Sequence, residues 1–248
     1  MITVKRGMES RYIAYDYLRS FERINAIIAA SDNSFEELDH IPPRDKLTFT
    51  NGFYVNCSAL FVDIRGSSEL PNQHRRPKLA KLYRAYLSEV VAIMCGNPQC
   101  AEISIIGDCV AGILDTRTKP HIDCVFSTAA QITSLIDVLN CKFELRRISP
   151  ITVGIGMSWG RALMIKAGFS GSTINDVVWM GDVVNEASKL CSYGNKDYGD
   201  MTMMVSNDFY FNLCDDYKNM LSPNYKRHCY HGNVANVAMS NWYEENCK

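Results

Sequence analysis

Short apolar runs alternate with amphipathic stretches between residues 54 and 193, and this order restricts the fold more than any other feature of the chain. The runs of strand length are 54–64, 102–106, 110–114, 152–158, 162–167 and 176–180. Apolar residues at helical spacing predict helices over 75–94, 121–139 and 181–193. Strand–helix–strand–strand–helix–strand is the ferredoxin-like order. We therefore expect an α+β domain with helices on one face of an antiparallel sheet.

Glycine-containing turns separate the predicted strands. Gly107-Asp108 predicts a tight hairpin, because this pair supports the backbone conformations that such turns need. Trp159-Gly160 predicts a second turn, which divides residues 152–167 into two paired strands.

The N-terminal part is predicted to be a separate element. Apolar residues recur at helical spacing over Glu9–Ala30, which predicts one long amphipathic helix whose aromatic side chains serve in packing or dimer contacts. Pro42 and Pro43 break this pattern. We therefore assign residues 1–45 to an N-terminal helix and linker, and residues 46–248 to the main domain.

Charge and composition exclude some classes of partner. The net charge is −1, so no overall positive field favours nucleic acid. Residues 1–10 lack the apolar core of a secretory signal, and no apolar run approaches the ~18 residues of a membrane span. The ten cysteines are scattered without a C-x-x-C pair. We expect reduced thiols in a cytoplasmic protein without a membrane span.

Two aspartates occupy the ends of neighbouring predicted strands. Asp63 ends the first apolar run, and Asp108 lies at the tip of the next hairpin. Two negative charges ~4 Å apart repel by about 4 kcal/mol at an effective dielectric constant near 20, and divalent cations turn this repulsion into coordination. Taken singly, each aspartate is also typical of a turn. Together they predict a two-metal site of the kind that serves phosphoryl transfer.

The loop after Asp63 has the composition of a phosphate-binding loop. Arg65, Gly66, Ser67 and Ser68 form it. Their backbone amides can cradle phosphates, as nests and helix N-termini do. Arg65 is expected either to face a substrate or to form a salt bridge within the loop.

Segments in this chain resemble, in sequence order, the motifs of class III adenylyl and guanylyl cyclases. They are 61–68 (FVDIRGSS), 105–108 (IIGD), 153–162 (VGIGMSWGRA) and 179–190 (WMGDVVNEASKL). The first two resemble the metal-binding motifs of the family. The third resembles its strand–turn–strand segment with a phosphate-binding arginine, and the fourth its helix with the transition-state asparagine and arginine.

The resemblance implies a homodimer with active sites at the subunit interface. Asp63, Asp108 and the Ile64 carbonyl would bind two Mg²⁺ or Mn²⁺ ions from one chain. Asn185 and Lys189 would reach in from the other chain, with Asn185 orienting the ribose. Lys189 stands where the family usually has arginine, so it keeps the charge but lacks the planar fork. Whether Lys189 substitutes for that arginine stays open.

The resemblance also implies the reaction. The 3′-hydroxyl of a nucleoside triphosphate attacks the α-phosphorus and pyrophosphate leaves, without a side-chain nucleophile. Arg161 matches the phosphate-binding arginine of the family. Its C-terminal triphosphate lysine has no clear match, and Lys226 and Arg227 are the nearest cations.

The predicted base pocket departs from that of the purine cyclases. Ser104 takes the position of their lysine or glutamate, and Val178 that of their aspartate or cysteine. Without these hydrogen-bonding partners, the pocket cannot read a purine edge in the familiar way. The chain thus resembles the bacterial Pycsar cyclases. This implies cyclic UMP made from UTP, or next cyclic CMP from CTP, as an antiphage signal that acts on a separate effector.

Other functions compete with this one. The nearest alternative is an adenylate or guanylate cyclase. A degenerate cyclase domain that binds nucleotide without turnover is supported by Lys189, but both aspartates and Asn185 speak against it. A plain ferredoxin-like interaction module would show no metal-dependent stabilisation by a nucleoside triphosphate.

Overall fold

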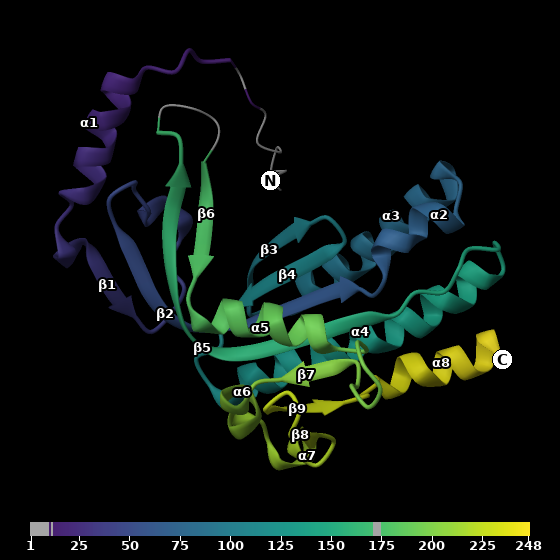
Figure 1. Ribbon diagram of the computed structural model, residues 1–248. Coiled ribbons are helices and arrows are strands. Elements are labelled where there is room, and N and C mark those ends of the chain that lie inside the picture. The colour runs from purple at the N-terminus through teal and green to yellow at the C-terminus, as the bar shows by residue number, and fades with distance from the viewer. Residues whose placement is uncertain (1–9, 11, 171–174) are drawn as a thin grey trace.

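A long sheet with helices on both faces makes up most of the molecule (Figure 1). The computed structural model describes residue 10 and residues 12–170 and 175–248. The strands are β1 (Phe35–Leu38), β2 (Gly52–Ile64), β3 (Cys100–Ile106), β4 (Cys109–Leu114), β5 (Val153–Gly168), β6 (Asn175–Met180), β7 (Met203–Val205), β8 (Ser222–Asn224) and β9 (Cys229–Gly232). The α-helices are α1 (Tyr17–Ile28), α2 (Leu70–Gln73), α3 (Arg76–Cys95), α4 (Lys119–Glu144), α5 (Asp182–Tyr193), α6 (Asn207–Asn212), α7 (Asp215–Lys218) and α8 (Val237–Cys247).

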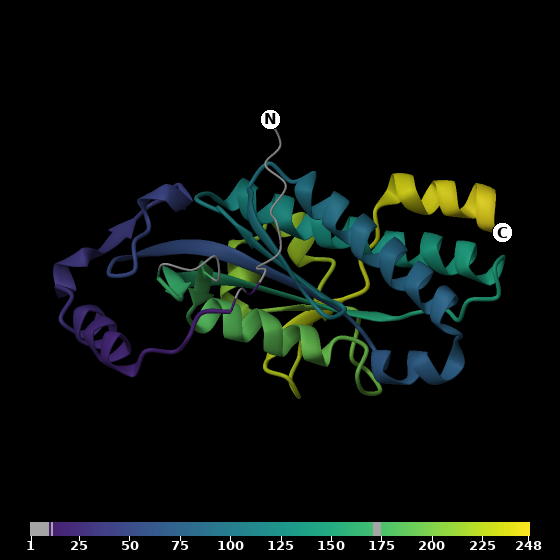
Figure 2. The same cartoon turned by 90° about the horizontal axis from the view of Figure 1, so that it is seen from above.

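The central part of the sheet is the ferredoxin-like core. Its strands lie in the order β3-β4-β2-β5, and each neighbouring pair is antiparallel. Helix α3 connects β2 to β3, and α4 connects β4 to β5. These two helices lie on one face of the sheet, as predicted, whereas α5 covers the opposite face (Figure 2). The sheet continues beyond β5 through β7, β9 and β8.

Strand β2 separates two apolar layers because its side chains alternate between the faces of the sheet. Leu60 and Val62 are fully buried in the cluster that includes α3 and α4. Cys57 and Ala59 are fully buried in a second cluster that includes α5. Asp63 has the same parity as Cys57 and Ala59, so its carboxylate belongs to the face that α5 covers.

Glycines in β5 allow α5 to approach the sheet closely. A Cβ on Gly156 would stand 2.1 Å from the carbonyl oxygen of Ala187, and one on Gly154 would stand 2.3 Å from that of Cys191. No side chain fits at these distances. Gly154 pairs with Asp63 in the sheet, so the C-terminal end of α5 lies beside the end of β2.

The predicted turn at Trp159-Gly160 is wrong, because β5 runs unbroken from Val153 to Gly168. Gly160 pairs with Cys57 and so lies within the β2–β5 ladder. The long β2 supplies a partner for each β5 residue up to Ile165, which keeps the strand extended through the glycine. The hairpin lies instead between β5 and β6, which pair from Leu163 to Gly168.

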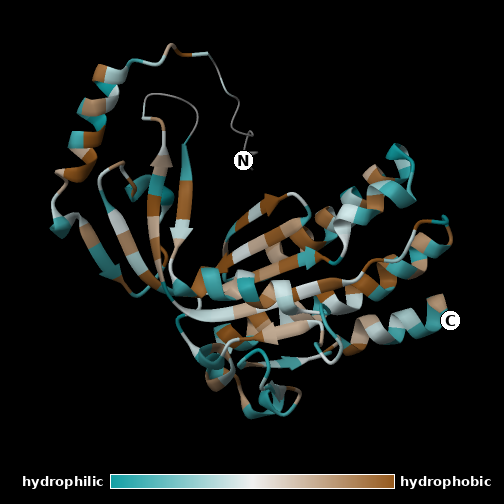
Figure 3. Cartoon of the chain, in the orientation of Figure 1, coloured by the Kyte–Doolittle hydropathy of each residue, from teal (hydrophilic) through white to brown (hydrophobic). Residues whose placement is uncertain are grey.

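Helix α1 is shorter than the predicted Glu9–Ala30. It begins at Tyr17, because the carboxylate of Asp16 accepts hydrogen bonds from backbone amides in the first turn and caps the helix. Glu9 itself lies outside the described residues. None of the 12 residues of α1, all of which the structure describes, is buried. Hydrophobic residues recur along this exposed helix (Figure 3), and their predicted dimer contacts stay a prediction.

The linker predicted before residue 46 contributes to the sheet. Strand β1 pairs in parallel with the beginning of β2, with Phe35 opposite Gly52. The division of the chain at residue 45 stays a prediction.

Helix α4 is the one described helix long and apolar enough to cross a membrane by length and composition. Within the fold, 61% of its most apolar stretch is buried. Phe126, Ile132 and other α4 side chains are fully buried in the main core. The apolar character of α4 is thus accounted for by its packing against the sheet.

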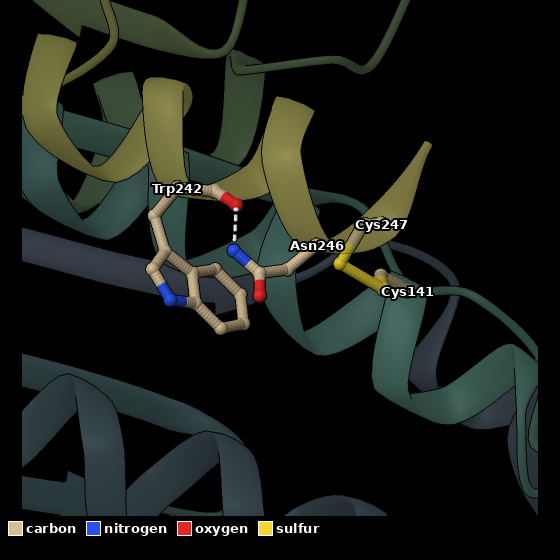
Figure 4. The surroundings of a disulfide bond; sticks show 4 residues. All are labelled: Cys141, Trp242, Asn246 and Cys247. Carbon is tan, nitrogen blue, oxygen red and sulfur yellow. Dashed lines mark hydrogen bonds between the residues drawn. A yellow bond between two sulfur atoms is a disulfide. The ribbon is translucent and has the colours of Figure 1, made fainter.

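Helix α8 is attached to α4 by a disulfide between Cys141 and Cys247 (Figure 4). The predicted set of reduced thiols is therefore wrong for this pair, because the fold brings their Cα atoms to 5.9 Å although they lie 106 residues apart. The other cysteines are free thiols. Lys142 also lies over the ring of Trp242, so two contacts hold α8 at its C-terminal half.

Candidate active site

Asp63 and Asp108 come together at the ends of neighbouring strands. Val62 pairs with Val110 across β2 and β4, so the next step along each strand brings Asp63 beside the turn that carries Asp108. Gly107 begins that turn with φ = 64°, a left-handed conformation that glycine adopts without strain. The predicted pair of carboxylates is thus present in one chain.

The surroundings of Asp63 raise the pKa of its carboxyl group. Burial raises the pKa of Asp63, the nearby Asp108 raises it further, and Arg65 lowers it. One oxygen of Asp108, Oδ2, is buried without a hydrogen-bond partner among the described residues. Arg65 therefore contacts Asp63, and the buried Asp108 oxygen is an acceptor left for a cation.

The donors at this site fit Mg²⁺ or Mn²⁺. Among residues 12–170 and 175–248, no group of three or more His, Cys, Asp or Glu side chains could hold a metal ion. Carboxylates from Asp63 and Asp108 and the carbonyl of Ile64 are hard oxygen donors, which suit these ions. Mg²⁺ commonly binds through one or two carboxylates plus substrate phosphates. A pair of aspartates is therefore a sufficient protein contribution.

Arg65 forms a salt bridge within the site, one of the two expected arrangements. Its Nη2 donates to Oδ2 of Asp63 at 2.7 Å and to the Asp63 carbonyl at 3.3 Å. Its Nη1 donates to the carbonyl of Ser192 in α5 at 3.1 Å. The side chain is only 17% exposed. The guanidinium is thus engaged with Asp63 and α5.

Two tyrosines of α3 lie near the aspartates and were missed in the sequence. Asp108 contributes to a raised pKa of Tyr83, whose main cause is burial, and the Tyr83 hydroxyl donates to the Ser67 carbonyl at 3.5 Å. Tyr86 is fully buried, and its hydroxyl has no partner among the described residues. Burial, with smaller effects of Asp63 and Asp108, raises its pKa. The sequence placed both tyrosines within the predicted helix 75–94 and gave no signal that either lies near the aspartates.

The predicted phosphate loop has an ordered backbone. Gly66 has φ = 63°, with open space around its α-carbon, and residues 67–69 form a 3₁₀ turn. The amide of Arg65 donates to the Thr152 carbonyl at 2.8 Å, which fixes the start of the loop. Phosphate binding by Gly66, Ser67 and Ser68 stays a prediction.

Arg161 lies far from the aspartates of its own chain. It pairs with Asn56 in the β2–β5 ladder, seven residue pairs from the Asp63–Gly154 pair, which corresponds to about 23 Å along a strand. Its guanidinium forms an ion pair with Glu37 and lies 4.1 Å from the centre of the Tyr54 ring. One chain therefore does not bring Arg161 to its own carboxylate pair.

Asn185 and Lys189 lie on the exposed surface of α5. They are four residues apart and so share one face of the helix. This is required if both reach into the same active site, as predicted. Ser192 continues the same face one turn later, and it is the residue whose carbonyl contacts Arg65. Through Arg65, the helix that carries the predicted transition-state residues is therefore connected to Asp63.

Ser104 and Val178 flank a hydrogen-bonded network that the sequence did not predict. The carboxylate of Glu102 accepts from the Trp179 indole at 3.0 Å and pairs with Arg44 at 2.5 Å. The network joins β3, β6 and the segment before β2. No local pattern predicts contacts over such separations. Contact of Ser104 and Val178 with a base stays a prediction.

Lys226 and Arg227 are committed elsewhere. Lys226 pairs with Asp197 at 2.8 Å, and Arg227 pairs with Asp197 and the buried Asp200 at 2.6 and 2.8 Å. These ion pairs give both cations a structural role.

The model of the adenylate and guanylate cyclase catalytic domain matches residues 50–218. The chain belongs to this family, and the resemblance seen in the motifs is confirmed. A uridylate cyclase from Gulbenkiania mobilis is 40% identical over 259 residues, covering 96% of this chain and 100% of that protein. A uridylate cyclase from Treponema porcinum is 38% identical over 208 residues, covering 84% of this chain and 72% of that protein.

Solved structures of cyclases share the fold. The adenylyl cyclase CyaB from P. aeruginosa has a TM-score of 0.59 at 22% identity, covering 69% of this chain and 85% of that one. A class III adenylyl cyclase-like ATP-binding protein from Pseudomonas aeruginosa has a TM-score of 0.69 at 16% identity, covering 91% of this chain and 48% of that one. At these identities the likeness concerns the fold alone.

Proposed function

We propose that this nucleotidyl cyclase converts UTP to 3′,5′-cyclic UMP and pyrophosphate, with CTP as the next-best substrate. The meeting of Asp63 and Asp108, with a buried oxygen left unpaired, supports the metal-dependent chemistry. Relatives described as uridylate cyclases at 40% and 38% identity support the choice of uracil. Ser104 and Val178, which lack the partners of a purine edge, agree with a pyrimidine.

In this proposal some residues of the site hold charge and others orient the substrate. Bound by Asp63, Asp108 and the Ile64 carbonyl, two Mg²⁺ or Mn²⁺ ions would supply an activated 3′-hydroxyl and neutralise the triphosphate. The amides of residues 66–68 hold phosphate oxygens by hydrogen bonds that need no rearrangement during the reaction. Positioning and preorganised charge thus supply most of the acceleration.

The remaining groups act from a second copy of the chain. Asn185 orients the ribose, and Lys189 stabilises charge on the reacting phosphate. Because Arg161 lies about 23 Å along the sheet from Asp63 in one chain, we assign it to phosphate binding in the site whose aspartates come from the partner. A homodimer with two interface sites satisfies all of these positions.

A substrate panel tests the proposal. The purified protein is incubated with each of the four nucleoside triphosphates and Mn²⁺, and the products are identified by mass spectrometry. We expect cyclic UMP as the main product, cyclic CMP next, and loss of both with Asp63→Asn. A main product of cyclic AMP or cyclic GMP would support the purine alternative, and metal-dependent nucleotide binding without turnover would support the degenerate one.

The biological setting is proposed on the same resemblance. Cyclic UMP would act as an antiphage signal on a separate effector, and the enzyme would act in the cytoplasm. Cells that carry the protein would then accumulate cyclic UMP on phage infection, which mass spectrometry of cell extracts would detect.

A further inference from the structure

Arg65 connects two parts of the chain that serve different active sites in the proposed dimer. On one side, its guanidinium holds Oδ2 and the carbonyl of Asp63, a proposed metal ligand. On the other side, it holds the carbonyl of Ser192 in the last turn of α5. In the proposed dimer, Asp63 belongs to one active site and α5 reaches into the other.

The contact with α5 is favourable for physical reasons. The last four carbonyls of an α-helix lack partners within the helix, and a cation at this end is stabilised by the helix dipole. The carbonyl of Ser192 is one of these groups. Arg65 therefore fixes the C-terminal end of α5, and its burial (17% exposed) strengthens the contact relative to a surface pair.

The glycines of β5 leave room for this arrangement. A Cβ on Gly154 would stand 3.2 Å from Cζ of Arg65 and 3.0 Å from the Gly194 carbonyl oxygen. The guanidinium is thus enclosed between the end of β2, the start of β5 and the end of α5. A displacement of the Asp63 carboxylate would therefore move the Arg65 guanidinium and, with it, the end of α5.

We propose that Arg65 is a positioning residue that couples the metal carboxylate of one active site to the helix that serves the other. Asn185, Lys189 and Ser192 lie on one face of α5, and Asn185 is about 10 Å from Ser192 along the axis. Arg65 thereby sets the position of that face. The inference rests on the proposed function, because it assigns Asp63 and Asn185 to opposite sites.

The first test uses Mn²⁺ alone, without nucleotide. Arg65→Lys keeps the charge but cannot bridge two acceptors with a planar fork. We expect Mn²⁺ affinity, measured by calorimetry, to fall about tenfold, and amide exchange in residues 189–194 to become about tenfold faster. Arg117→Lys is the matched control, because Arg117 also holds a carboxylate through two nitrogens, that of Asp115 beyond the far end of β4 from Asp108. It should change neither value.

A mixed dimer provides the decisive test. One chain carries Asp108→Ala and donates its α5, and the other carries Asn185→Ala and donates its aspartates, so each dimer has one complete site. Arg65→Lys in the α5 donor should lower kcat about tenfold and leave the Mn²⁺ requirement unchanged. The same change in the aspartate donor should instead raise the Mn²⁺ concentration needed by about tenfold.

The outcomes separate the inference from the proposed function. If the wild-type protein neither binds Mn²⁺ nor makes a cyclic nucleotide, both fail. If it does both, but Arg65→Lys in the α5 donor leaves kcat unchanged, only the inference fails. If Arg65→Lys unfolds the chain, Arg65→Gln replaces it in the same mixed dimer, because glutamine keeps one amide group as a donor. An unchanged kcat with Arg65→Gln in the α5 donor would then contradict the inference.

Discussion

The two halves of the proposed active site differ in how the chain holds them. The metal half is partly buried: Asp63 is 34% exposed, and the guanidinium of Arg65 that holds it is 17% exposed. The substrate half is open: the side chain of Arg161 is 56% exposed, and Asn185 and Lys189 are exposed on α5. The carboxylates, which must lie close together, are thus held by contacts within one chain, whereas Arg161, Asn185 and Lys189 act in the proposal only when a second chain is present.

The largest expected effect is on the metal half. Asp108→Ala should lower kcat for cyclic UMP by roughly 10³-fold, because it removes one of the two carboxylates proposed to bind the metal ions that stabilise the reacting phosphates. Calorimetry should show loss of Mn²⁺ binding. The free energy of unfolding without metal should not fall, since one of two repelling charges is gone. Asp216→Ala, at an exposed position in α7, is the control, and equal activity of both variants would contradict the metal assignment.

The proximity of Asp63 and Asp108 was predictable from the sequence for a simple reason. Asp63 lies at the end of one apolar strand, and Asp108 lies in the hairpin that joins the next two. The ferredoxin-like order makes these strands neighbours. The register that brings the carboxylates together is then set by the alternation of buried side chains. The contact of Arg65 with Ser192 was not predictable, because it depends on how closely α5 approaches the glycines of β5.

The substrate half was harder to predict. Trp159-Gly160 has the composition of a turn, but its pairing with β2 keeps the strand extended. Tertiary contacts often override local preference in this way. Arg161 consequently lies within a long strand, far from Asp63. The link between Glu102 and Trp179 joins residues from separate motifs. Such positions depend on three-dimensional packing, and for Arg161 we infer a dependence on the second chain.

Changes to stability should not reproduce the catalytic effects if the two halves act as described. Cys247→Ser removes the disulfide to Cys141, which closes a long segment of chain. We expect the free energy of unfolding in urea to fall by about 2–4 kcal/mol, with kcat unchanged. Adding a reductant should bring the wild-type protein to the same value. Cys214→Ser, at an exposed free cysteine, should change neither, and a fall in kcat with Cys247→Ser would place α8 in the catalytic machinery.

A smaller effect is expected at the open half. Arg161→Ala should lower kcat about 10- to 100-fold through loss of charge at the phosphates, while Mn²⁺ binding without nucleotide stays unchanged. Arg161→Lys should recover only part of the loss, because lysine lacks the planar fork. Glu37→Gln, which frees Arg161 from its ion pair, should keep or raise kcat. Weaker Mn²⁺ binding by Arg161→Ala would show that the halves are not separate.

The smallest effect concerns the choice of base. Ser104→Lys combined with Val178→Asp places the hydrogen-bonding partners of adenylyl cyclases at the resembling positions. The ratio of kcat/KM for ATP to that for UTP should rise about tenfold, because a base whose polar edge gains partners is bound better in the transition state. Ser104→Ala with Val178→Ala changes the same positions without adding partners and should leave ATP use unchanged. An unchanged ratio in the first variant, with turnover intact, would place base recognition elsewhere, and the neighbouring Glu102 network is the next position to vary.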